Sequence, residues 1–130
     1  MTHCNLASAL LKRGAVTGLD DGQRDAMISH LEAALDADPR LPEAHYALAG
    51  VLASRGDLPG AARHYATAAK LKTNFAQAVN NLGVVLVNQG EIDRAITSFQ
   101  EAVRLRPDYA EAQANLDKAR DVKRQNETRK

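Results

Sequence analysis

Residues 76–109 read AQAVNNLGVVLVNQGEIDRAITSFQEAVRLRPDY, and this stretch decides the fold. A shift of the sequence by 34 residues lays it on residues 42–75, where eight positions are identical. The identical pairs are Ala44/Ala78, Leu48/Leu82, Val51/Val85, Leu52/Leu86, Gly56/Gly90, Ala61/Ala95, Ala68/Ala102 and Leu71/Leu105. A repeat of this period indicates stacked copies of one structural unit.

Each copy is predicted to consist of two helices. Val79, Leu82 and Leu86 recur at the spacing of one helix face, and Gly90 favours the left-handed conformation that ends a helix. A second apolar stripe follows at Ile92, Ala95, Ile96, Phe99, Ala102 and Val103. Pro107 ends this helix because the residue before a proline disfavours helical geometry. Such a hairpin cannot bury both faces alone, so it stacks on its neighbour.

Short polar motifs predict where helices begin. The spacing of a capping box occurs three times, in Asp20 with Gln23, in Asn74 with Gln77 and in Asp108 with Glu111. Small residues at Gly83, Ala95 and Ala102 would let neighbouring helices approach closely. The sequence is therefore consistent with a closely packed, helical architecture.

One set of residues carries a family resemblance. The set is Asn81, Leu82, Gly83, Leu86, Gly90, Ala95, Phe99, Ala102 and Pro107. It resembles the tetratricopeptide repeat, and the copy at 76–109 is similar to the repeat arm of O-linked N-acetylglucosamine transferase. The resemblance implies an all-α, right-handed superhelical solenoid of about three helix-turn-helix units plus a C-terminal capping helix.

The resemblance also implies a division of the chain. We expect a single repeat domain over residues 1–124, with repeats at approximately 5–41, 42–75 and 76–109. A capping helix is expected over 110–124, followed by a flexible basic tail over 125–130.

Charge is balanced overall but not along the chain. The 17 Lys and Arg against 16 Asp and Glu give a net charge of +1. Residues 118–130 carry +4 and the rest of the chain −3. Because the basic segment holds no aromatic residue for base stacking, we expect a solvated helix end and no nucleic-acid binding. Contact with nucleic acid or an anionic membrane is the alternative interpretation of this segment.

Composition excludes several protein classes. Cys4 is the only cysteine, so the chain cannot form an internal disulfide. No apolar run is long enough to span a membrane, and the first residues lack the features of a secretory signal. These observations favour a cytoplasmic location as the default.

Motifs for catalysis were sought in the sequence. It contains no Gly-rich phosphate loop, no His-Glu-x-x-His and no Cys-x-x-Cys, so we predict no enzyme activity, no cofactor and no metal. His30, His45 and His64 fall in predicted helices, and His30 and His64 occupy the same repeat position. Because a metal would need a further converging ligand, these side chains are interpreted as helix-surface or interface histidines.

In the family, the first helix of each repeat lines a concave face that binds proteins or extended peptides. Carried over to this sequence, the predicted partner-binding residues are Glu43, Tyr46, Gly50, Gln77, Asn80, Asn81, Val84, Asn88, Glu111, Asn115 and Lys118. Asn81 and Asn115 match the asparagine ladder of the transferase arm, whereas Ala47 interrupts it. An amide suits main-chain binding because it both donates and accepts, but solvation alone is an equal alternative.

We predict a scaffold or adaptor whose groove of roughly 25–30 Å accommodates about eight extended residues with micromolar affinity. The alternative function is a substrate-recruiting module of a larger enzyme such as a glycosyltransferase. Some members of the family bind the acidic C-terminal tails of chaperones through a clamp that includes cationic side chains. We do not expect this clamp here, because Ala47, Gln77 and Asn81 stand at its positions and the cationic residues are missing. The exposed apolar end of the first repeat favours self-association.

Overall fold

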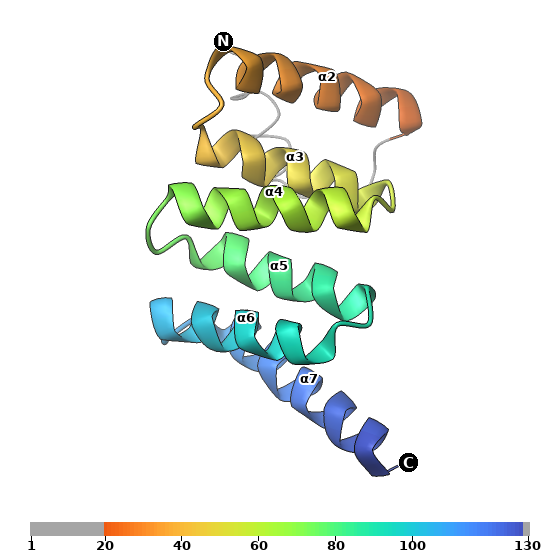
Figure 1. The fold of residues 1–130 in the computed structure, drawn as a ribbon, viewed down its shortest axis with the longest axis vertical. Coiled ribbons are helices and arrows are strands. Elements are labelled where there is room, and N and C mark those ends of the chain that lie inside the picture. Colours follow the sequence, from red (N-terminus) through yellow and green to blue (C-terminus); the bar gives the residue numbers. More distant parts are fainter. Residues whose placement is uncertain (1–19, 129–130) are drawn as a thin grey trace. The chain divides into compact units, whose positions relative to one another are not determined.

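The computed structural model describes residues 20–128, which contain six helices and no strand (Figure 1). The chain divides into two compact units, the first ending at Lys72 and the second beginning at Thr73. The all-α prediction is confirmed for the described residues, and within each unit consecutive helices pack against one another. The expected first helix of the first repeat, before Asp20, lies outside them, as does the apolar end proposed for self-association.

The first unit contains three described helices, α2 (Asp21–Ala37), α3 (Pro42–Ser54) and α4 (Leu58–Leu71). Consecutive helices run antiparallel, and α3 packs against both α2 and α4 (Figure 1). One cluster of its core consists of buried apolar side chains from α2 and α3, namely Met27, Leu31, Ala44, Ala47, Leu48 and Val51. Four of these six belong to α3, so the helix with the predicted partner-binding residues is also the centre of the unit.

The second unit contains α5 (Ala76–Asn88), α6 (Ile92–Leu105) and α7 (Ala110–Thr128). Each of these three helices packs against the other two. The core combines Leu86, Ala95, Phe99, Leu116 and Ala119. Phe99 is 1% exposed and lies directly against Gly83, which confirms that small residues allow a close helix approach.

The turn inside each helical hairpin has the same geometry in both units. Gly56 and Gly90 have φ angles of 85° and 81°, in the left-handed region that glycine adopts without strain. The N–H of Asp57 donates to the carbonyl of Leu52 at 2.9 Å, and the N–H of Glu91 donates to that of Leu86 at 2.8 Å. The repeat of 34 residues in the sequence is therefore also a repeat of backbone structure.

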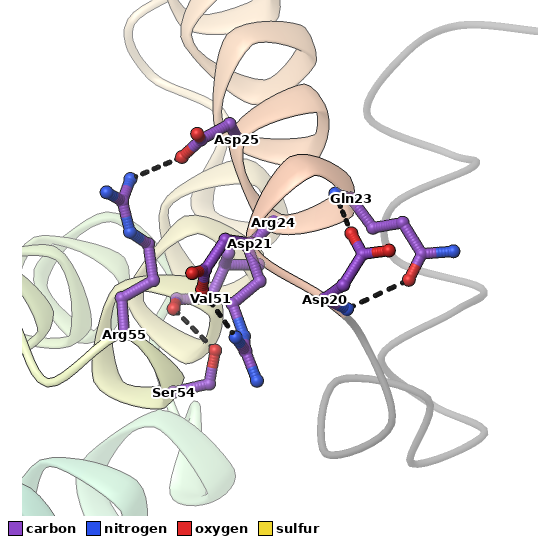
Figure 2. Close-up of polar contacts among 8 residues, drawn as sticks. All are labelled: Asp20, Asp21, Gln23, Arg24, Asp25, Val51, Ser54 and Arg55. Carbon is purple, nitrogen blue, oxygen red and sulfur yellow. Dashed lines mark hydrogen bonds and ion pairs between the residues drawn. The ribbon is translucent and has the colours of Figure 1, made fainter.

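The first predicted capping box is confirmed. Gln23 N–H donates to Asp20 Oδ1 at 2.7 Å, and Asp20 N–H donates to Gln23 Oε1 at 3.0 Å (Figure 2). An ion pair of 2.7 Å between Asp25 and Arg55 then joins α2 to the end of α3 (Figure 2). The start of α2 is thus fixed both within the helix and to its neighbour.

The capping box predicted at Asn74 is wrong. Asn74 has a φ of 65°, and its carbonyl accepts from the N–H of Ala76 at 2.9 Å. Helix α5 therefore begins one residue later than expected, with Phe75 at the N-cap and without a side-chain cap. Asparagine tolerates the left-handed region better than most residues, and here it makes a turn rather than a cap.

Helix α7 continues to Thr128, beyond the expected end at 124. Its last part is rich in residues with high helix propensity, and Arg124 pairs with Asp121 one turn earlier. Residues 120–128 are all exposed, and Lys123 forms an ion pair of 2.9 Å with Asp93 of α6, so surface interactions rather than core packing maintain this end of the helix.

Candidate functional site

One face of α5 is rich in amides. Gln77, Asn81, Val84 and Asn88 follow each other at intervals of three or four residues, which places them on one side of the helix. Gln77, Val84 and Asn88 are exposed and Asn81 is half-buried. Val84 and Val122 are the two large apolar side chains that are clearly exposed among the described residues, each at 38%. The α5 face therefore combines hydrogen-bonding groups with one apolar contact point.

A similar face runs along α7. Glu111, Asn115 and Lys118 are separated by four and three residues, so they also share one side of their helix. Glu111 and Lys118 are exposed, while Asn115 is half-buried. The face presents an acidic group, an amide and a basic group in succession.

A hydrogen bond joins these two faces. Asn115 Nδ2 donates to Asn80 Oδ1 at 3.1 Å, and Asn80 Nδ2 donates to Asn81 Oδ1 at 3.4 Å. The sequence placed Asn80 among the partner-binding residues, but its side chain is fully buried. Its predicted place at the surface is therefore corrected. The side chain of Asn80 lies between α5 and α7 and hydrogen-bonds the amides of Asn81 and Asn115. We call Asn80, Asn81 and Asn115 the amide cluster.

The other predicted partner-binding residues belong to the first unit. Glu43, Tyr46 and Gly50 lie on α3 at spacings of three and four residues. Lys72 Nζ donates to Glu43 Oε1 at 3.0 Å. The ring of Tyr46 meets that of Tyr65 edge to face, with centroids 5.6 Å apart and an interplanar angle of 66°. Both side chains are therefore held by contacts within the unit.

Two histidines of the first unit form a contact that sequence reasoning did not predict. His45 Nδ1 and His64 Nδ1 are 3.0 Å apart, and His45 Nε2 is 2.9 Å from the carbonyl oxygen of Pro39. A carbonyl only accepts, so His45 Nε2 carries a proton. In the neutral pair, His45 Nδ1 then accepts from the Nδ1–H of His64.

The electrostatic surroundings of His64 disfavour its charged form. Burial lowers the pKa of His64, and the nearby His45 and Arg63 lower it further, whereas Asp57 raises it. The sequence suggested a relation of His64 to His30 by repeat position, but the structure bonds it to His45. The contact joins α3 to α4, and helical spacing alone does not show which side chains of two helices meet.

Within residues 20–128, no cluster of three or more His, Cys, Asp or Glu side chains could hold a metal ion. No helix in the same range combines the length and apolar character needed to cross a membrane.

Comparison with known families decides the assignment. Family models described as tetratricopeptide repeat and TPR repeat match residues 19–78 and 85–119, respectively. The chain belongs to the tetratricopeptide-repeat family. The second match to this tetratricopeptide-repeat protein includes Asn115 on α7. A sequence search found no match among curated proteins.

Solved structures extend the comparison of this tetratricopeptide-repeat protein. MamA is 22% identical with a TM-score of 0.80, covering 93% of this chain and 66% of that chain. A mutant Thermobaculum terrenum O-GlcNAc transferase is 28% identical with a TM-score of 0.74. The match covers 90% of this chain and 22% of the transferase chain. The first TPR of Spaghetti (RPAP3), bound to the HSP90 peptide SRMEEVD, is 18% identical with a TM-score of 0.79, covering 92% and 89%.

Proposed function

We propose that this protein is an interaction module that binds an extended peptide segment of a partner protein through the first helix of each repeat. The observation that carries the proposal is the amide cluster, which joins the faces of α5 and α7 through the Asn80–Asn115 hydrogen bond. Amides can bond the main chain of a peptide whatever its side chains are. The predicted contacts in the second unit are Gln77, Asn81, Val84, Asn88, Glu111, Asn115 and Lys118.

We propose a separate set of contacts on α3 of the first unit. Tyr46 offers an aromatic edge that its contact with Tyr65 keeps in place, and Gly50 is half-buried on the same helix. Glu43 is bound to Lys72, so this pair would act on a ligand as two opposite charges rather than as a lone carboxylate. We therefore place the main-chain contacts in the second unit.

Structural neighbours support peptide binding as a class of function. The structures of two RPAP3 TPR domains contain the HSP90 peptide SRMEEVD and the HSP70 peptide SGPTIEEVD. At 18% and 16% identity these neighbours share the fold with our chain. Because Ala47 and Gln77 are uncharged, we expect weak or no binding of these acidic peptides and use them as negative probes.

The experiment is a selection from a displayed library of random peptides of about eight residues. Selected peptides are then added to the isotope-labelled protein, and amide chemical shifts are followed. The proposal expects the largest shifts at Asn81, Val84 and Asn115. Shifts confined to exposed residues of α6, such as Gln100, would place the ligand elsewhere and refute it.

A second candidate is a recruiting module of a larger enzyme. It is favoured by the 28% identity to the O-GlcNAc transferase of Thermobaculum terrenum, of which this chain spans 22%. The reading frame of the gene around these residues decides between the candidates. A catalytic domain in the same frame would support this second function, and a reading frame without one would refute it.

A further inference from the structure

Asn80 is a fully buried amide on α5. Burying an amide costs free energy unless its polar atoms form hydrogen bonds. Asn80 meets this condition because Oδ1 accepts from Asn115 and Nδ2 donates to Asn81. A leucine has the same number and branching of side-chain heavy atoms without polar groups, so what asparagine supplies at this position is directed hydrogen bonding.

The hydrogen bond to Asn80 determines how the amide of Asn115 is turned. Its Nδ2 points at the buried Oδ1 of Asn80, and an amide carries its oxygen on the opposite branch. Within residues 20–128, Arg24 Nε is the buried side-chain polar atom without a hydrogen-bond partner. Asn115 Oδ1 is not such a buried atom. Asn115 is half-buried and its hydrogen bond to Asn80 uses the side-chain nitrogen, so its oxygen is the amide atom left to accept from a ligand.

We propose that Asn80 is a positioning residue that fixes Asn115 Oδ1 as an acceptor for a main-chain N–H of the bound peptide. This inference rests on the proposed function and adds to it which kind of group on the ligand is bound at Asn115. The ligand must present a donor at Asn115, and a main-chain N–H supplies one at every residue except proline.

The neighbouring side chains fit this ligand. Glu111 and Lys118 lie one turn to either side of Asn115 on α7, and both are exposed. Val84 on α5 offers an apolar contact for one side chain of the peptide. The surface therefore combines an oriented side-chain oxygen, which accepts from the main chain of the peptide, with weak selectivity for the side chains of the peptide.

The first test uses the folded wild-type chain without ligand. Hydrogen exchange of the side-chain amides is measured by NMR, with the exposed amide of Asn88 as the internal reference. We expect one Nδ2 proton of Asn115 to exchange about two- to tenfold more slowly than those of Asn88, the range set by one net hydrogen bond. Equal exchange at Asn88 and Asn115 would overturn the positioning role.

Two variants separate positioning from packing. Asn80→Leu keeps the number and branching of the side-chain heavy atoms but removes the acceptor, so slow exchange at Asn115 should be lost. Asn80→Asp keeps an acceptor at the same place and should retain slow exchange, although it loses the donor to Asn81. If Asn80→Leu fails to fold, the wild type and Asn80→Asp still decide. Fast exchange in folded Asn80→Asp would overturn the role.

The second test addresses the ligand. A peptide of about eight residues, selected on the wild type, is N-methylated at one position at a time, which removes one main-chain N–H. We expect one position at which methylation weakens wild-type binding about two- to tenfold. In Asn115→Ala and Asn80→Leu the same methylation should have no effect. An equal loss in all three proteins would overturn the inference.

The two tests distinguish the inference from the function on which it rests. Slow exchange at Asn115 without any selectable peptide would refute the proposed function, and the assigned acceptor role with it, but leave the orientation of the amide established. A bound peptide whose methylation profile does not depend on Asn80 would refute the inference and leave peptide binding intact.

Discussion

The Nδ1 atoms of His45 and His64 lie 3.0 Å apart, so a single proton joins the two rings between α3 and α4. The carbonyl of Pro39 holds the other side of His45 and thereby fixes its tautomer. Full protonation of both rings would put two N–H groups against each other at this contact. The pair therefore holds the hairpin together best when at least one ring is neutral.

Acid should destabilise the protein through His64. Burial and the nearby His45 and Arg63 hold the pKa of His64 below its ordinary value of 6.5. The unfolded chain then binds more protons between the two pKa values, so stability falls as pH falls. The contribution of neutral His64 is fully present above the unfolded pKa and is lost as pH falls through the folded pKa.

This pH dependence is measured by urea unfolding at about pH 8 and about pH 5. We expect the loss of unfolding free energy on acidification to be smaller in His64→Gln than in the wild type. His30→Gln removes another histidine of the first unit and should keep the wild-type loss. A full acid-induced loss in His64→Gln would show that His64 is not the responsible group.

Gly83→Ala should strongly destabilise the second unit. A Cβ at this position would lie 2.5 Å from Cε1 and 2.7 Å from Cδ1 of Phe99. Phe99 is 1% exposed, so its ring can move only by disturbing the core. We expect a loss of about 1–3 kcal/mol in unfolding free energy, the usual cost of overpacking.

Gly22→Ala is the matched control for this substitution. A Cβ at Gly22 would meet only Asp20 Oδ1, at an ordinary contact distance of 3.4 Å. Thermal and urea unfolding of the two variants are compared, and Gly22→Ala should stay within about 0.5 kcal/mol of the wild type or exceed it. Equal stability of the two variants would contradict the close approach of α5 and α6.

Asp20→Ala should weaken the start of α2. The substitution removes the 2.7 Å hydrogen bond from Gln23 N–H, and we expect a cost of about 0.5–2 kcal/mol. Asp20→Asn retains a side-chain oxygen and should cost little. Amide exchange in α2 reports the effect, and equal protection in the alanine and asparagine variants would argue against the cap.

The fold was predictable because the signals that begin and end the helices are local in the sequence. Gly90 ends α5 as expected, and Leu105 is the last residue of α6, just before Arg106 and Pro107. These signals depend on backbone preferences within a few residues. The Asn74 turn was missed because asparagine favours caps and left-handed turns alike, and only the surrounding chain decides between them.

The candidate site was less predictable. Helical spacing placed Asn80 on the same side as Gln77 and Val84, but it could not show that α7 approaches and buries it. The contact of His45 with His64 likewise depends on how two helices of one hairpin pack. Periodicity gives the side of a helix, whereas burial and hydrogen bonding depend on the neighbouring helix.

The central claim is that the amide cluster of the second unit binds a peptide. Isothermal titration compares a library-selected peptide on the wild type, on Asn81→Ala/Asn115→Ala, and on the control Gln100→Ala/Gln113→Ala, which removes two exposed amides elsewhere in the unit. All three proteins must first show the same helical circular dichroism. We predict at least about a fivefold loss of affinity in the first double variant and none in the control. Equal affinity of the peptide for all three proteins would contradict the account.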